Sequence, residues 1–156
     1  MAVRSAGLLI YRRRNKRLEV FLIHPGGPFW ARRDEGSWSI PKGEYGPEEA
    51  PLDAARREFT EETGWAAPKT CVPLGDVRQK AGKIVSAWAA EGDFDPATLK
   101  SNTFEMEWPR NSGNSQEFPE VDRGDWFTME RAMSKILPAQ APLLERLSVL
   151  LTTSDG

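Results

Sequence analysis

The most informative stretch of the chain is residues 43–65, GEYGPEEAPLDAARREFTEETGW. It places a glycine loop before a predicted helix and gathers carboxylates at the far end of that helix. Glu58, Glu61 and Glu62 stand at i, i+3 and i+4, so they project from one helical face. Like charges at this spacing repel by about 0.2–0.5 kcal/mol per pair. A hard divalent cation turns that repulsion into binding, and Mg²⁺ prefers oxygen ligands together with substrate phosphates.

The fixed positions in this stretch form a longer pattern. Gly43 is followed by five residues and Glu49, then by seven residues and the run REFTEETGW of residues 57–65. Nine specified positions over 23 residues make a chance match far rarer than one to a lone glycine-rich loop. The pattern resembles the box of the Nudix hydrolases. This resemblance implies an α/β/α sandwich with a mixed β-sheet, and hydrolysis of a nucleoside diphosphate linked to another group.

The resemblance also implies a metal cofactor, Mg²⁺ with Mn²⁺ as the alternative. Glu58 and Glu62 would be the principal metal ligands, and Glu61 a further ligand or the base that activates water. Which carboxylate acts as the base stays open. The Gly43 carbonyl would complete the metal shell. The chemistry agrees, because a metal ion neutralises phosphate oxygens and lowers the pKa of bound water.

Arg57 is expected to orient one of the glutamates through a fork-shaped salt bridge. Its expected partner is Glu49, eight residues earlier on nearly the same helical stripe. We therefore place Arg57 with Glu58 and Glu61 among the residues that serve catalysis.

A more distant carboxylate is expected to complete the site. Many relatives carry a glutamate six residues before a tryptophan that opens a strand, and Glu120 stands six residues before Trp126. Glu120 is therefore predicted as a distal metal ligand or base. Its rivals are Glu105, Glu107 and Glu117.

Several residues are candidates for substrate binding. Lys42 lies in a Pro-Lys-Gly triplet similar to that of family members that act on dinucleoside polyphosphates or diphosphoinositol polyphosphates. This resemblance implies a long phosphate chain as substrate, and exposure of Lys42 to solvent is an equal alternative. Phe29 and Trp30, adjacent in a long loop, can stack on a base, or the loop can cover an apolar patch. Lys83 and Arg110 are candidate phosphate contacts.

Hydrophobic periodicity and turn residues predict a single domain over residues 1–156. A helix is expected from near Pro47 to Gly64, which has the position of a helix-ending glycine. Residues 109–119 are expected to form a loop. Strands are predicted at 5–11, 18–24, 38–40, 72–79, 83–90, 103–108 and 125–127, and further helices at 128–136 and 142–151.

Composition narrows the function classes. The net charge of −2 gives no general attraction to nucleic acid or to an anionic membrane. Cys71 is the only cysteine and His24 the only histidine, which excludes an internal disulfide and multi-histidine zinc sites. His24 is expected to have a local structural role. No apolar run reaches the length of a membrane span, and the absence of export signals favours the cytoplasm.

The expected partner is therefore a small nucleotide substrate, first a dinucleoside polyphosphate and then a nucleoside triphosphate. The segments HPGGPFW, SNTFEMEWP and EFPEVDRGDWF are similar to a bacterial subgroup of Nudix proteins related to nucleoside triphosphate pyrophosphohydrolases. A homodimer is possible on the same resemblance. Two alternatives remain open: a Nudix-fold module that senses a nucleotide without cutting it, and an enzyme that processes RNA 5′ ends.

Overall fold

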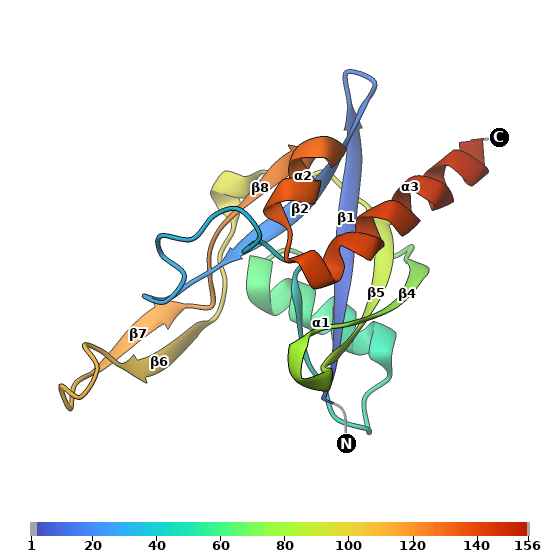
Figure 1. The fold of residues 1–156 in the computed structure, drawn as a ribbon. Helices are drawn as coiled ribbons and strands as arrows, with labels where there is room; N and C mark the ends of the chain where they lie inside the picture. The colour runs from blue at the N-terminus through green and yellow to red at the C-terminus, as the bar shows by residue number, and fades with distance from the viewer. Residues whose placement is uncertain (1–2, 156) are drawn as a thin grey trace.

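A six-stranded mixed sheet forms the centre of the computed structural model, which describes residues 3–155 and side chains to residue 153 (Figure 1). The strand order is β4-β5-β1-β2-β8, and β3 pairs with β1. The β1–β5 pair is parallel and the other pairs are antiparallel. The strands are β1 (Arg4–Arg14), β2 (Arg17–Pro25), β3 (Lys42–Glu44), β4 (Val72–Arg78), β5 (Ile84–Glu91) and β8 (Val121–Thr128).

Helices cover both faces of the sheet, which confirms the predicted α/β/α sandwich. Helix α1 (Pro51–Thr63) buries Ala55 and Phe59 against Leu8 and Phe21 on one face. On the other face, helices α2 (Met129–Lys135) and α3 (Ala141–Asp155) pack against residues such as Leu9. Adjacent residues of β1 thus pack into the cores on opposite faces of the sheet, because side chains alternate along a strand. No helix in the described residues is long and apolar enough to cross a membrane.

Strand β1 changes its neighbour halfway along its length. Ser5, Ala6 and Gly7 pair with β3, whereas the half from Ile10 to Arg14 pairs with β2 on the same side. Because β3 belongs to the segment that leads into α1, this change places residues 42–44 close to the catalytic helix predicted from the sequence.

Helix α1 begins later than the sequence suggested. Pro47 lies in a turn, and Pro51 occupies the first helical turn instead. A proline is tolerated there because its missing N–H would have no helical partner. The predicted end is correct: Gly64 has φ +80° and its N–H donates to the Thr60 carbonyl.

The predicted loop at residues 109–119 is only partly a loop. Its second half forms β7 (Ser115–Pro119), which pairs with β6 (Thr103–Glu107) in a separate two-stranded hairpin. The sequence did not predict β7, because its SQEFP residues are almost entirely exposed and lack an alternation of apolar and polar side chains. The predicted strand at 38–40 is reduced to isolated bridges at Trp38 and Ser39.

His24 has the structural role expected from its position. Its ring is fully buried, with Nδ1 2.8 Å from Asp122 Oδ1 and Nε2 2.6 Å from the Arg33 carbonyl oxygen. The histidine therefore connects the end of β2 to the loop that follows it and to β8.

Candidate active site

The C-terminal half of α1 lies against β3, with the Glu58 carboxylate next to Gly43 and Glu62 bonded to the Lys42 N–H. A Cβ atom added to Gly43 would lie 2.0 Å from Glu58 Oε2. Real Cβ atoms essentially never come within 3.0 Å of another atom in this way. Only glycine therefore leaves room for this carboxylate beside the β3 backbone.

Arg57 organises the carboxylates around it, and its main partner is Glu49, as predicted. Two parallel hydrogen bonds of 2.9 Å join the guanidinium to the Glu49 carboxylate. The same side chain donates through Nη1 to Glu58 Oε1 at 2.8 Å and to Glu61 Oε2 at 3.1 Å. These contacts raise the pKa of Arg57, and they fix the side-chain direction of Glu58.

Glu62 is the most strongly perturbed acid of the site. Its Oε2 accepts a 2.7 Å hydrogen bond from the Lys42 backbone N–H. Burial raises the pKa of Glu62 to about 8, against the opposing effect of Lys42, and repulsion from Glu58 and Glu120 adds to the increase. Burial likewise raises the pKa of Glu58, although Arg57 opposes it. A bound cation would stabilise the ionised form of both carboxylates, because it offsets their negative charge.

Glu120 lies on the bend between β7 and β8, within electrostatic reach of the helix carboxylates. Its own pKa is raised by partial burial and then by the charge of Glu61. The backbone links the two regions, because Asn102 N–H donates to the Glu61 carbonyl and Glu120 N–H donates to the Asn102 carbonyl. The three rival glutamates, Glu105, Glu107 and Glu117, stand on the exposed side of the hairpin. None of them is among the groups that raise the pKa values of Glu58, Glu62 and Glu120.

The donor set fits a hard divalent cation, because it consists of carboxylate oxygens beside backbone that only glycine permits. Within residues 3–155, no three His, Cys, Asp or Glu side chains are already close enough to form a finished metal cage. Glu58 and Glu61 instead turn toward Arg57, and Glu62 toward the Lys42 N–H. Metal binding would therefore compete with these hydrogen bonds.

Two of the four predicted substrate-binding residues lie together at this site. Burial lowers the pKa of Lys42, Glu62 opposes this effect, and the nearby charge of Lys83 lowers the pKa further. Trp30 and Arg110 have other partners: the Arg33 guanidinium lies over the Trp30 ring, and that of Arg110 lies 6.0 Å from the Phe29 ring centroid.

Two contacts at or near the site were not predicted. The Lys42 backbone N–H, rather than its ammonium group alone, contacts Glu62. The rings of Phe29 and Trp108 meet across a long sequence separation at a centroid distance of 5.9 Å. The predicted strand at 103–108 includes Trp108, but no sequence signal gave its partner.

The fold and these carboxylates define an α/β/α hydrolase-type domain with a cation-compatible acidic site. A family model described as NUDIX domain matches residues 1–147. The chain therefore belongs to the Nudix family, and it is a hydrolase that acts on phosphorus-containing anhydrides. Members of the family generally use divalent metal ions and act on small nucleotide substrates.

Two curated relatives share the name bis(5′-nucleosyl)-tetraphosphatase [asymmetrical]. The rat protein is 35% identical over 108 residues, which cover 61% of this chain and 69% of the relative. The mouse protein is 33% identical over 103 residues, which cover 58% of this chain and 66% of the relative. The matched region thus spans about two thirds of each relative. These similarities support nucleotide pyrophosphate hydrolysis as the general activity.

Solved structures agree on the fold. A C. elegans Ap4A hydrolase, in a binary complex, superposes with a TM-score of 0.65 at 25% identity and covers 97% of this chain and 99% of its own. The NUDIX domain of Shewanella oneidensis NrtR, solved with ADP ribose, has a TM-score of 0.66 at 16% identity. The match covers 97% of this chain and 89% of the NrtR chain. The second similarity, at its low identity, shows the fold alone.

Changing Arg57 to Lys is expected to lower kcat by about 10–100-fold, the usual cost of losing a group that orients metal ligands. Lysine cannot make the paired bonds to Glu49 while it also reaches Glu58. Steady-state kinetics over a Mg²⁺ titration would measure the loss. Arg56→Lys is the matched control, because Arg56 donates to backbone carbonyls of residues 68 and 69 and contacts the Cys71 side chain, away from the carboxylates. An equal loss in both variants would contradict the assigned role.

Changing Glu62 to Gln is expected to stabilise the metal-free protein at pH 8. The pKa of Glu62 is about 8 when folded and ordinarily 4.5, so folding favours the protonated acid. Its contribution to stability is present below the ordinary pKa and is lost as pH rises toward 8. Gln keeps an acceptor for the Lys42 N–H without the charge, a gain of about 1–3 kcal/mol.

Thermal unfolding in a chelator between pH 5 and pH 8.5 would measure this difference. The wild-type melting temperature should fall across the range more than that of Glu62→Gln. Added Mg²⁺ should raise the melting temperature of the wild type far more than that of the variant. Parallel pH profiles for the two proteins would contradict the assignment of Glu62 as a buried, metal-responsive acid.

Proposed function

We propose that this protein hydrolyses a pyrophosphate bond in a dinucleoside polyphosphate with the help of Mg²⁺; nucleoside triphosphates are the next candidates. The observation that carries the proposal is the pair of acids on one face of α1, the buried Glu58 and the partly buried Glu62, held against β3 by Gly43 and the Lys42 N–H. Similarity to the asymmetrical tetraphosphatases supports the choice of dinucleoside substrates.

In this proposal Glu58 and Glu62 hold the metal, with Glu61, Glu120 and the Gly43 carbonyl as further ligands. When bound, Mg²⁺ or Mn²⁺ neutralises phosphate oxygens and lowers the pKa of a bound water. The chain itself supplies the orientation of the carboxylates, because Arg57 fixes Glu58 from the side. Either Glu61 or Glu120 accepts the proton of the attacking water, since Glu58 and Glu62 are assigned to the metal.

Lys42 and Lys83 are proposed to contact the phosphate chain. Lys83 lies near Lys42, and its positive charge contributes to lowering the pKa of Lys42 by repulsion. A phosphate between them relieves this repulsion. Substitution of either lysine should therefore raise KM more than it lowers kcat.

A substrate panel with Mg²⁺ tests the proposal. It contains diadenosine polyphosphates, nucleoside triphosphates, nucleotide sugars, ADP-ribose, and capped or triphosphorylated RNA, with products separated by chromatography. We expect the highest kcat/KM on a diadenosine polyphosphate. Faster turnover of RNA 5′ ends than of free nucleotides would overturn the substrate class, and tight nucleotide binding without product would overturn hydrolysis.

A further inference from the structure

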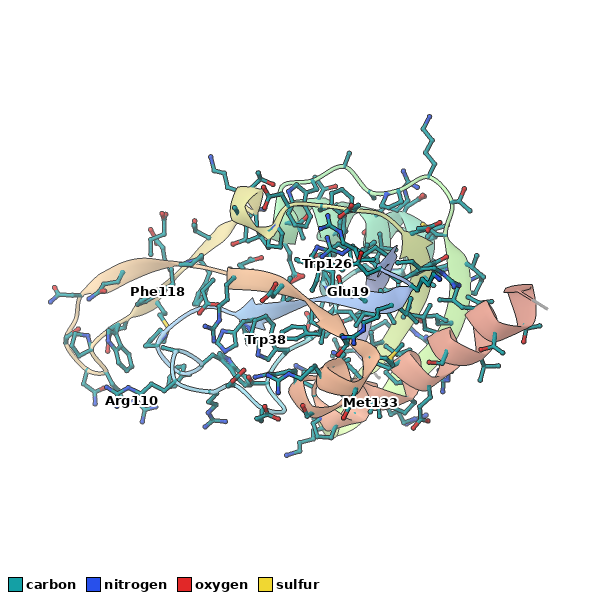
Figure 2. All side chains as sticks on the ribbon, turned by 90° about the horizontal axis from the view of Figure 1, so that it is seen from above. Glu19, Trp38, Arg110, Phe118, Trp126 and Met133 are labelled. Carbon is teal, nitrogen blue, oxygen red and sulfur yellow. The ribbon has the colours of Figure 1, made fainter. Side chains whose placement is uncertain are left out.

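The β6–β7 hairpin and the loop before it form one unit that projects from the domain. We call residues 26–33 together with 103–119 the wing. The hairpin lies to one side of the central sheet, and Arg110 and Phe118 lie away from the body (Figures 1 and 2). Gly27 packs so tightly on Phe104 that an added Cβ would lie 2.9 Å from its ring, and Gly26 N–H donates to the Glu120 carbonyl. Loop and hairpin therefore hold one another in place.

The outer end of the wing carries an exposed aromatic cluster with a cation. Phe29 is 54% exposed, and it is the only aromatic residue among the exposed large hydrophobic residues in the described part of the chain. Trp108 meets it in a T-shaped contact at 75° and a centroid distance of 5.9 Å. The Arg110 guanidinium stands 6.0 Å from the Phe29 centroid. A flat base attached to phosphate matches these two kinds of group.

The inner end of the wing is fixed to the catalytic helix. Lys100 N–H donates to the Thr63 carbonyl at 2.9 Å, and Asn102 N–H donates to the Glu61 carbonyl at 2.8 Å. From there β6 runs outward for five residues, which is about 17 Å at the rise of an extended strand. A group bound at the wing tip therefore lies well beyond the pyrophosphate bond held at the carboxylates.

We propose that the wing tip is a subsite for the second nucleoside of a dinucleoside polyphosphate. The distal base stacks on the exposed part of Phe29 next to Trp108, and Arg110 pairs with the outer part of the phosphate chain. A nucleoside triphosphate has a single base and does not occupy both ends of this distance. The subsite therefore selects substrates with a nucleoside at each end of the phosphate chain. This inference rests on the proposed function.

The test compares two substrates across three variants. In Phe29→Ala and Arg110→Gln, KM for diadenosine tetraphosphate should rise about tenfold, because removing a stacking aromatic or a phosphate contact costs roughly one such factor. The kcat/KM for ATP should stay close to the wild-type value. Val149→Ala on α3 is the control, since Val149 is 66% exposed and lies outside the wing. This control variant should leave the kinetic constants for both substrates unchanged.

Two outcomes overturn the subsite: an equal loss on both substrates, or no loss on either. Binding separates this failure from failure of the proposed function. Diadenosine tetraphosphate is titrated calorimetrically into Glu62→Gln with and without Phe29→Ala. Tenfold weaker binding without Phe29 supports the subsite even where no hydrolysis occurs. Hydrolysis of the dinucleotide with Phe29-independent binding leaves the function intact and rejects the subsite.

Discussion

Glu58→Gln should reduce kcat on the preferred nucleotide by about a thousandfold. A bound metal supplies several kcal/mol of transition-state stabilisation, and about 4 kcal/mol corresponds to a factor of roughly a thousand. The amide keeps the size of the carboxylate and still accepts the 2.8 Å bond from Arg57, so the fold should survive. Initial rates at saturating Mg²⁺, together with a melting curve, would measure both effects.

Thr60→Ser is a suitable control for this variant, because Thr60 is an exposed residue of the same helical turn. It should retain nearly full activity. Activity of Glu58→Gln within about threefold of the wild type, less than 1 kcal/mol, would show that Glu58 does not hold the metal.

Gly43→Ala should be nearly as damaging to activity while leaving the fold intact. The new methyl group would occupy the position of the Glu58 carboxylate, 2.0 Å from Oε2. The flexible end of Glu58 can swing aside, so the displacement changes the metal site more than the core. We expect kcat to fall by at least about a hundredfold, as for misplaced catalytic groups in general.

Gly46→Ala provides the matched control for Gly43→Ala. Gly46 lies three residues further along, and no atom lies within 4 Å of the position of an added Cβ. Its activity should remain close to that of the wild type. If Gly43→Ala were equally active, the contact between Gly43 and Glu58 would have no catalytic importance.

The sequence was most informative where chemistry imposes a fixed spacing. Glu58 and Glu62 had to share a helical face, so local periodicity was enough to predict their common direction. Arg57 does bond to Glu49 as predicted, but Glu49 lies before the first residue of α1 and not on a shared helical stripe. The buried strands around Leu9 and Leu22 were equally predictable, since their apolar runs have no other place in a compact domain.

Features that depend on tertiary packing were harder to predict. The β7 strand is polar and exposed, and only pairing with β6 makes it a strand. The start of α1 moved from Pro47 to Pro51 because both prolines suit a first helical turn. The contact between Phe29 and Trp108 joins a loop to a hairpin far away in the sequence, so no local sequence pattern predicts it.

The most direct test is turnover of diadenosine tetraphosphate with and without Mg²⁺, by the wild-type protein and by Glu62→Gln. We expect nucleotide products only from the wild type with the metal present, and the identity of the products would show which bond is cut. Equal turnover by the two proteins, or turnover that persists in a chelator, would contradict a metal-dependent hydrolase built on Glu58 and Glu62.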